Sequence, residues 1–439
     1  MQLRPYQLEL VERVNAKFEA GTRTVVMQLG TGGGKTATAA EILRRATAMG
    51  YRSNFFAHLD ALIGDTHARL VAGGVHAGFI QAGRPTDSTA PVQVCSLQTL
   101  HRRGDRPPAD FNILDECHRA QSASVRAILD SYPRAALLGL TATPQRGDGK
   151  PLGPDPFSEL VCGPQNRWLT EHGHLVPCDV FAPDTFLEKS VLAQHPVTAY
   201  QEHAAGKRAL VFATNVAHAE QLCAEFLAAG FSAACLTGKT SRTRREEFRA
   251  AMQAGELLVL IGVGVFIEGW DEPSVECIVL ARAFSVLGSF FQAIGRGLRP
   301  SPSTGKARCI VLDLRGSVNV HNCLPDDEVE WSIDGVAVKR IGAVTALMRC
   351  KECLAIFRPA ARCPRCGSTS KGSPRLPTSR AQRLENIAHL PQHERDARYF
   401  DALVGVGIRN RGFSIERAKR WASWLFFKKF KRQPSLRAA

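Results

Sequence analysis

The 439-residue sequence lacks the segments that mark exported and membrane proteins. Its first residues, MQLRPYQLEL, contain no apolar core of the kind that a secretory signal needs. The longest apolar run, LLVLIGVGVFI at 257–267, is far shorter than the roughly 20 apolar residues of a membrane span. We therefore expect a soluble, cytoplasmic protein without a membrane partner.

The sequence also lacks a disulfide framework, although it contains 13 cysteines. Nine of them are scattered through strand-like and helix-like stretches. In a chain without an export signal, we interpret these nine as buried, reduced thiols. The other four cysteines lie between residues 350 and 366, where they form two CxxC pairs.

Net charge is absent from most of the chain. Lys and Arg number 56 against 41 Asp and Glu, which gives a formal charge of +15. Residues 371–439 carry +11 of this charge and residues 346–370 carry +4, so residues 1–345 are neutral. A neutral body with a basic C-terminal end favours contact between that end and a polyanion. A solvated basic tail without a partner is the alternative.

The composition, 44% hydrophobic and 22% charged, is that of a globular protein, and the length suits two or three domains. Through residues 1–345, short β-rich runs alternate with helical patterns, which predicts parallel sheets covered by helices. The expected strands of the first half are 24–29, 53–58, 92–97, 111–116 and 135–143, with a helix over 35–50. The expected strands of the second half are 208–214, 232–238, 257–263, 275–281 and 309–314, with a helix over 217–230.

This repeated order predicts an α/β fold with two tandem parallel-sheet domains, residues 1–182 and 207–345, joined by a linker over 183–206. Beyond them we expect three further parts of the chain. They are a small cysteine-rich knuckle at 346–370, a Ser-, Pro- and Gly-rich linker at 371–400, and a basic helical segment at 401–439.

The segment LGTGGGKT at 29–36 follows an expected strand and opens an expected helix. Glycines let backbone N–H groups converge on a phosphate at a helix N-terminus. Lys35 would neutralise the β- and γ-phosphates, and the Thr36 hydroxyl would bind Mg²⁺. Leu29 stands where the strict P-loop pattern has Gly, yet we favour phosphate binding over a structural Gly-rich turn. The expected phosphate-binding residues are Thr31, Gly32, Gly33, Gly34, Lys35 and Thr36.

The tetrapeptide DECH at 115–118 ends the apolar strand FNIL. Two adjacent carboxylates at the end of a strand are costly to hold together unless a cation or a reaction uses them. Asp115 would bind the Mg²⁺ shell, and Glu116 would polarise the attacking water. Asp-Glu is also a common surface pair, but its place about 80 residues after a P-loop favours the catalytic interpretation.

Together these motifs resemble those of superfamily 2 helicases of the DExH type, and the resemblance covers roughly residues 3–370. The segments that carry it are LRPYQ (3–7), GTGGGKT (30–36), VCSLQTL (94–100), DECH (115–118), TAT (141–143), FIEGWDEP (266–273) and QAIGRGLR (292–299). The phrases LTATPQRGDG and EGWDEPSV, with the closing knuckle, look most like phage and prophage DEAD/DEAH-box DNA helicases. The resemblance implies two RecA-like domains that bind ATP and Mg²⁺, in a bacterial or phage-infected cell.

The resemblance also assigns residues to the adenine and to the second domain. Gln7 would read the adenine edge, with Arg4 and Tyr6 supporting that pocket. Gly269 and Asp271 would line the nucleotide from the second domain.

Further residues would take part in hydrolysis and in its coupling to nucleic acid. Gln292 would lie near the attacking water, and Arg296 and Arg299 would reach the γ-phosphate, where positive charge stabilises the transferring phosphoryl group. The residues expected to couple the nucleotide site to the nucleic-acid channel are His118, Thr141 and Thr143.

Two regions are expected to contact nucleic acid. By resemblance, Gln98 and Thr99 would contact the backbone, whereas Leu59 replaces an arginine that relatives often carry. In the final segment, aromatic residues are interleaved with cations, which suits stacking on unpaired bases and contact with phosphates. Five residues there share one helical stripe: Arg417, Arg420, Trp424, Lys428 and Lys431. The alternative is a helical cap whose aromatic side chains pack on the core.

The pairs Cys350–Cys353 and Cys363–Cys366 have the spacing of a structural zinc site, in which four thiolates surround one tetrahedral ion. Such a small element has almost no core, so metal binding would supply its folding energy. A redox CxxC is the alternative, but redox pairs normally occur singly before a helix.

The sequence therefore predicts an ATP-dependent helicase or translocase that acts on single-stranded, forked or duplex DNA. An RNA-dependent ATPase is the alternative among enzymes, because the motifs contact the nucleic-acid backbone and do not by themselves distinguish RNA from DNA. The alternative from another class is a nucleic-acid binding or annealing module whose affinity ATP switches.

Overall fold

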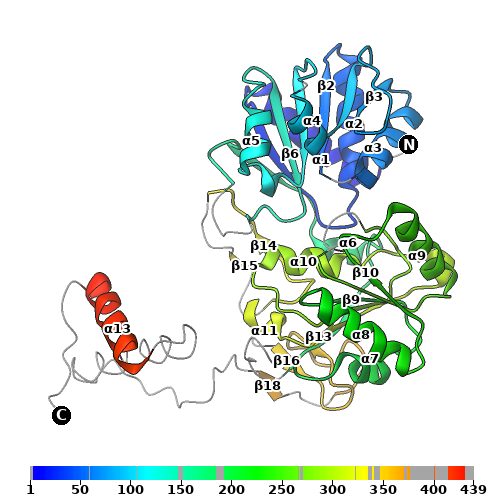
Figure 1. Ribbon diagram of the computed structural model, residues 1–439, viewed down its shortest axis with the longest axis vertical. Coiled ribbons are helices and arrows are strands. Elements are labelled where there is room, and N and C mark those ends of the chain that lie inside the picture. The colour runs from blue at the N-terminus through cyan, green and yellow to red at the C-terminus, as the bar shows by residue number, and fades with distance from the viewer. Residues whose placement is uncertain are drawn as a thin grey trace. The chain divides into compact units, whose positions relative to one another are not determined.

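The computed structural model describes residues 3–58, 60–104, 106–146, 152–183, 192–264, 266, 270–321, 323–334, 339–340, 347–369, 373–375, 400 and 414–430. The chain forms two compact units, Met1–Pro377 and Thr378–Ala439. In Figure 1, the strands of the first half of unit 1 run from blue to cyan and those of its second half from green to orange.

Sheet A has seven strands, all parallel, in the order β3-β4-β2-β5-β6-β1-β7. The strands are β1 (Thr24–Gln28), β2 (Ser53–Ala57), β3 (Ala77–Ile80), β4 (Val92–Ser96), β5 (Phe111–Asp115), β6 (Ala136–Thr141) and β7 (Glu159–Cys162). Successive side chains of a strand point to opposite faces. Val25 and Met27 accordingly pack in one core cluster and Val26 in another, so both faces of the sheet are covered.

The helices of this half carry recognisable start signals. The helices are α1 (Pro5–Glu19), α2 (Lys35–Ala48), α3 (Asp60–Ala72), α4 (Leu97–Arg103), η1 (Cys117–Arg119) and α5 (Ala123–Leu129). Pro5 stands in the first turn of α1, where its missing N–H costs no hydrogen bond. The Ser96 side chain caps α4 by accepting a hydrogen bond from the Thr99 amide at 3.3 Å.

Sheet B has nine strands in the order β10-β11-β9-β12-β13-β8-β17-β16-β18. The first six are parallel, and they are β8 (Cys178–Phe181), β9 (Ala209–Phe212), β10 (Ala233–Leu236), β11 (Val259–Gly262), β12 (Cys277–Leu280) and β13 (Cys309–Asp313). The helices of this half are α6 (Asn166–Glu171), α7 (Pro196–Ala204), α8 (Val216–Ala228), α9 (Arg242–Ala254), α10 (Leu287–Gly295), η2 (Pro302–Thr304) and α11 (Ser317–His321). Asn215 and Ser241 cap α8 and α9 through their side chains.

Of the three antiparallel strands at the end of sheet B, two lie in the cysteine-rich knuckle, and the third lies in the segment expected to be a linker. They are β16 (Leu347–Arg349), β17 (Ile356–Phe357) and β18 (Ser373–Arg375), and β17 pairs with β8 through Ile356 and Val180. The knuckle therefore continues the second sheet instead of hanging from a linker. A separate pair, β14 (Val329–Glu330) and β15 (Lys339–Arg340), forms a short two-stranded sheet.

The expected fold class, α/β with two tandem parallel-sheet domains, is confirmed. Each of the ten expected strands overlaps an observed one, as do the helices expected over 35–50 and 217–230. The sequence did not predict strands β3, β7, β8 and β14 to β18. The expected domain end at residue 182 follows β8, yet β8 pairs with β13 in sheet B. The chain thus crosses to the second sheet before that residue, between β7 and β8.

In unit 2, the described helix is α13 (Ile415–Phe430), which agrees with the helical segment expected there. Across the described residues, no helix combines the length and apolar character that a membrane crossing requires.

Candidate functional site

The glycine-rich segment 30–34 lies between the end of β1 and the start of α2. Gly32 and Gly34 have φ values of 86° and 93°, a region that favours glycine. Lys35 begins α2, and its Nζ donates a hydrogen bond to the Leu29 carbonyl at 3.2 Å. Burial lowers the pKa of Lys35, against the opposing effect of the Glu116 and Asp115 charges. Thr36 occupies the first turn of the same helix and is half-buried.

The N-terminal residues brace this loop. Tyr6 Oη and Gln7 Nε2 donate hydrogen bonds to the same carbonyl, that of Gly33, at 2.8 and 2.9 Å. The Arg4 amide donates to Gln7 Oε1 at 2.9 Å, which fixes the orientation of the Gln7 amide. Arg4 and Gln7 thus lie beside the P-loop, where their expected adenine contact stays a prediction.

Asp115 is the last residue of β5, and Glu116 follows it. Strand β5 pairs with β6, which in turn pairs with β1, the strand that leads into the P-loop. Glu116 has a φ of 49°, which is uncommon for a residue with a side chain and marks a strained position. Its Oε2 lies 3.3 Å from His118 Nδ1. Burial alone would raise the pKa of Glu116, but the hydrogen bond with His118 and the charges of Lys35 and Arg296 lower it to about 2. Glu116 is therefore ionised at neutral pH.

Gln292 connects Glu116 with the threonines that follow β6. Its Nε2, on α10 of the second half, lies 3.5 Å from Glu116 Oε2 and 3.4 Å from Thr143 Oγ1. The Thr141 hydroxyl donates to the Thr143 carbonyl at 2.9 Å and accepts from the Thr143 amide at 3.1 Å. Of the expected coupling residues, His118 thus contacts Glu116 directly, and Thr143 is linked to it through Gln292. Thr141 is hydrogen-bonded to Thr143.

Arg296 and Arg299 follow α10 and face the P-loop. Arg296 Nη1 donates to the Trp270 carbonyl at 2.8 Å, and Arg299 forms an ion pair with Asp271. A methyl group on Gly32 would lie 3.3 Å from Arg299 Cγ, so this arginine packs against the P-loop itself. Burial lowers the pKa of Arg299 to about 10, and it remains a cation at neutral pH.

Helix α10 contacts the first half through two glycines, Gly288 and Gly295, for which the sequence predicted no role. A methyl group on Gly288 would lie 2.7 Å from Thr143 Oγ1, and one on Gly295 would lie 2.5 Å from Thr31 Cβ. Side chains other than hydrogen cannot fit at such distances without a shift. Gly295 belongs to the QAIGRGLR segment, whereas no sequence pattern singled out Gly288.

The segment between β7 and β8 also contacts the P-loop. A methyl group on Gly30 would lie 2.8 Å from Asn166 Oδ1, and one on Gly32 would lie 3.0 Å from Leu175 Cδ2. Tyr6 packs edge-on against Trp168, with ring centroids 5.5 Å apart. None of these contacts follows from a local motif, so sequence reasoning did not find them.

The residues expected to contact nucleic acid have different surroundings. Gln98 is exposed on α4, and its Nε2 donates to the His58 carbonyl at 2.9 Å. Thr99 is buried, and its hydroxyl accepts the Ala82 amide at 3.2 Å. In unit 2, α13 carries the exposed residues Arg417, Arg420 and Trp424. Gly269, Lys431 and Leu59 lie outside the described residues, as does the side chain of Lys428.

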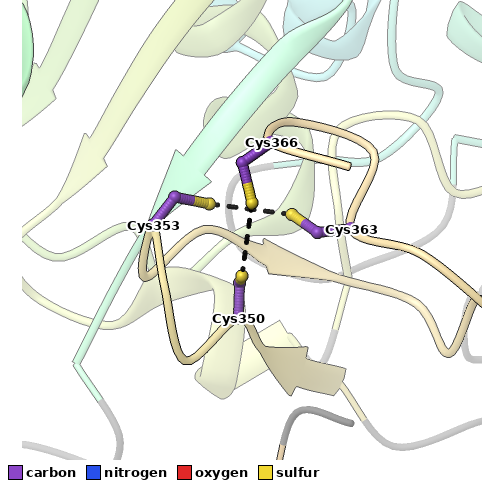
Figure 2. Close-up of side chains that lie close together, drawn as sticks. All are labelled: Cys350, Cys353, Cys363 and Cys366. Atoms are coloured by element: carbon purple, nitrogen blue, oxygen red, sulfur yellow. Dashed lines mark hydrogen bonds between the residues drawn. The ribbon is translucent and has the colours of Figure 1, made fainter. Parts of the chain in front are cut away.

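The four clustered cysteines converge on one point. Their sulfur atoms all lie within 4.8 Å of one another, and the pairs Cys350–Cys366 and Cys353–Cys363 are 3.6 Å apart (Figure 2). In a tetrahedral zinc site with Zn–S bonds of about 2.3 Å, the sulfur atoms lie about 3.8 Å apart. The two pairs thus form a single four-sulfur site of the right size for such an ion.

The backbone explains how each CxxC pair turns. The residue after the second cysteine has a positive φ in both pairs, 62° at Leu354 and 72° at Gly367. The Leu354 amide donates to the Cys350 carbonyl at 3.1 Å, and the Gly367 amide to the Cys363 carbonyl at 2.9 Å. The two knuckles are therefore built alike, which favours one shared ion over a single redox pair.

Comparison with known proteins gives matches to two families. Residues 1–146 match the family described as "Type III restriction enzyme, res subunit", and residues 190–301 match "Helicase conserved C-terminal domain". The chain is 29% identical over 356 residues to "Putative mitochondrial ATP-dependent helicase irc3" of Schizosaccharomyces pombe, an alignment that covers 72% of this chain and 58% of that protein. It is 25% identical over 366 residues to the "51.5 kDa protein" of a Lactococcus phage, covering 78% and 77% of the two chains.

Solved structures resemble the chain as well. A fragment of a putative HsdR subunit of a type I restriction enzyme from Vibrio vulnificus has a TM-score of 0.57 at 20% identity, covering 77% of this chain and 70% of that chain. The type ISP restriction-modification enzyme LlaBIII, bound to DNA, has a TM-score of 0.54 at 15% identity, covering 71% of this chain and 28% of that chain. At these identities the likeness concerns the fold, and it confirms the tandem RecA-like domains.

Proposed function

Because the chain belongs to the superfamily 2 helicases, we propose that it couples ATP hydrolysis to movement along DNA or to its unwinding. The observation that carries the proposal is the meeting of both domains at one carboxylate. Gln292 of the second half lies 3.5 Å from Glu116 of the first half, and Arg299 packs on the P-loop. Residues from two domains that share one nucleotide site make hydrolysis sensitive to domain closure.

The P-loop residues would hold the phosphates of ATP. The glycine-rich segment leads into the N-terminus of α2, a position that favours an anion, and Lys35 would add the charge that the β- and γ-phosphates require. Thr36 and Asp115 supply the oxygen ligands that Mg²⁺ prefers, and the ion would neutralise phosphate charge. The adenine side would be read by Gln7 with Arg4, and Gly269 and Asp271 would close the site from the second domain.

Glu116 would orient the attacking water and attract its proton, since the pKa of this carboxyl group keeps it ionised. Gln292 would position the same water. Arg296 and Arg299 would stabilise the charge that develops on the transferring phosphoryl oxygens, an effect worth about 10³–10⁵ in rate in related reactions. His118, Thr141 and Thr143 surround this centre and would transmit its state to the nucleic-acid channel.

DNA is the proposed nucleic-acid partner. The solved structure of the restriction-modification enzyme LlaBIII is bound to DNA, which supports this choice for a chain of the same fold. Gln98 on α4 is exposed and so can reach a phosphate backbone, and α13 offers Arg417, Arg420 and Trp424. A phage protein among the relatives supports an origin in a bacterial or phage-infected cell.

We propose in addition that Cys350, Cys353, Cys363 and Cys366 hold one structural Zn²⁺. Four sulfurs within 4.8 Å suit a tetrahedral ion, and thiolates are its preferred ligands. Metal analysis of the purified protein should find about one zinc per chain, and the double change of Cys350 and Cys353 to Ser should remove it. Zinc-free protein with a Cys363–Cys366 disulfide would contradict the metal site.

One experiment separates the candidate functions. ATPase rates and strand displacement are measured in parallel with single-stranded DNA, duplex DNA, forked DNA and RNA, with Glu116→Gln as the inactive control. We expect DNA to stimulate hydrolysis and a forked DNA to be unwound or traversed. Stronger stimulation by RNA would identify an RNA-dependent ATPase instead. ATP-dependent changes in affinity without movement would identify a binding module, and absence of hydrolysis on all substrates would refute the proposal.

A further inference from the structure

We infer that Asp327 is a positioning residue that links the four-cysteine element to the P-loop, so that zinc binding and nucleotide binding strengthen each other. The inference rests on the proposed zinc and ATP sites. It concerns a buried carboxylate that belongs to none of the helicase motifs and lies in the loop after α11.

Asp327 is the centre of a charged cluster. Its carboxylate is 8% exposed and receives Arg358, which follows β17 of the cysteine-rich element. Arg358 Nε donates to Asp327 Oδ1 at 3.1 Å, and its Nη2 donates to Oδ2, so the pair is bidentate. Arg167 Nη2 lies 4.0 Å from the same Oδ1, so loss of Arg358 would leave Asp327 with this one longer ion pair. Loss of a partner from a buried pair is strongly destabilising. The position of this loop therefore depends on the knuckle.

The loop that contains Asp327 is also hydrogen-bonded to the segment between β7 and β8, which connects the two sheets. Asn166 Nδ2 donates to the Pro325 carbonyl at 2.9 Å. The Gln165 side chain makes two hydrogen bonds to Val329, donating to its carbonyl at 2.8 Å and accepting from its amide at 2.9 Å. Residues 324–329 are thus tied to the start of α6 by side chains that offer both donors and acceptors.

The connecting segment in turn touches the P-loop. Asn166 packs so closely on Gly30 that a methyl group there would lie 2.8 Å from Asn166 Oδ1. One pocket brings all three regions together, and its lining includes Gly30, Thr31, Gln165, Asn166, Pro325 and Asp327. Within the loop, the Leu324 amide donates to Asp327 Oδ2 at 2.8 Å. A contiguous path therefore runs from Arg358 to Asp327, along residues 324–325 to Asn166, and on to the phosphate-binding loop.

A second charged contact of the knuckle provides the matched control. Arg365 Nε lies 3.5 Å from Asp179 Oδ2 on β8, and its guanidinium lies 4.7 Å from the centre of the Phe181 ring. Arg365 thus fastens the knuckle to sheet B at a different place. Both arginines stabilise the knuckle, but Arg358 alone of the two contacts Asp327 in the described residues.

The test measures zinc affinity with and without a nucleotide. Zinc is titrated against a competing chelator in the full chain, in the absence and presence of a non-hydrolysable ATP analogue, for the wild type, Arg358→Met, Asp327→Asn and Arg365→Met. Coupling between sites typically changes affinity about 5–150-fold, and we expect about fivefold tighter zinc binding with the analogue. Arg365→Met should keep this factor, whereas Arg358→Met and Asp327→Asn should reduce it to less than about twofold.

Linkage requires a reciprocal effect, because the same factor must describe nucleotide binding. Zinc removal should therefore weaken binding of the analogue about fivefold in the wild type and not in Arg358→Met. Equal zinc affinities with and without analogue, or equal loss of coupling in Arg358→Met and Arg365→Met, would overturn the inference. If the wild type binds no zinc, the metal site itself is refuted, and analogue affinity in Arg358→Met against Arg365→Met still decides whether Asp327 positions the P-loop.

Discussion

Glu116, the proposed catalytic carboxylate, is contacted by residues from both halves of unit 1. Its backbone is held at a φ of 49°, where strain costs about 1–3 kcal/mol and persists only if the surroundings enforce it. Its carboxylate lies 3.3 Å from His118 and 3.5 Å from Gln292, which come from different halves of unit 1. A carboxylate held in this way can respond to the position of the second domain.

Replacing Glu116 by Gln should abolish ATP hydrolysis, a loss of at least about 10²-fold, because the amide cannot attract the water proton. ATP binding should persist, because Lys35 and Asp115 remain. Turnover and nucleotide affinity are measured separately, with the exposed Glu9→Gln on α1 as control. Near-normal turnover in Glu116→Gln would contradict the catalytic assignment.

Arg299 is expected to act on the transition state. It packs on Gly32 as a half-buried cation, so it would lie near the charge that develops on the phosphoryl oxygens of a bound ATP. Arg299→Ala should lower kcat by about 10³-fold with a much smaller change in KM. A loss confined to KM would make Arg299 a binding residue instead.

At the scale of elements, α10 brings the second half of unit 1 into contact with the first. It carries Gln292 into the site and presents Gly288 and Gly295 to the threonines of the first half. Arg299, which follows α10, forms an ion pair with the exposed Asp271. A helix that packs through hydrogen atoms in place of side chains permits the short distances on which Gln292 depends.

Gly288→Ala should therefore separate the halves near Thr143. The added methyl would lie 2.7 Å from Thr143 Oγ1, and overpacking of this kind costs about 1–3 kcal/mol. We expect kcat to fall about tenfold or more. The melting temperature should change little, because the added methyl group destabilises only the state in which α10 contacts the first half. Ser289→Ala, on the same helix, is the control, and an unchanged kcat in Gly288→Ala would show that the contact is not needed.

At the scale of the whole molecule, the ATPase motifs and the net positive charge lie in different parts of the sequence. Residues 1–345 are neutral and contain the ATPase motifs, whereas residues 346–439 carry the net positive charge. In unit 2, Trp424 and Phe427 of α13 are 56% and 48% exposed, among exposed cations. Exposed aromatic rings beside cations suit stacking on bases with contact to phosphates.

Deleting residues 401–439 tests this division, because it removes a net charge of +8 and no ATPase motif. DNA binding should weaken, and its dependence on salt should become shallower because fewer counterions are released. Basal ATPase without DNA should barely change. An unchanged salt dependence with a lower melting temperature would mean that the aromatic residues pack on the protein instead.

The sequence by itself determined the local chemistry of this protein. A glycine-rich helix start and carboxylates at a strand end predict phosphate binding at Lys35 and metal and water binding at Asp115 and Glu116, and these roles stay predictions. The expected strands from 24–29 to 309–314 were found because buried β-branched runs specify parallel strands. The four cysteines were recognised from spacing alone.

Only the tertiary structure decided which distant segments meet. Strand β8 joins sheet B, Gly288 touches Thr143, and Asp327 receives Arg358, and each contact joins residues far apart in the sequence. Local patterns carry no signal for such pairings, because they depend on packing that forms after the elements do. The physical reason is that secondary-structure propensity and motif spacing depend on residues close together in the sequence. Burial and charge pairing depend on which distant residues become neighbours in the folded chain.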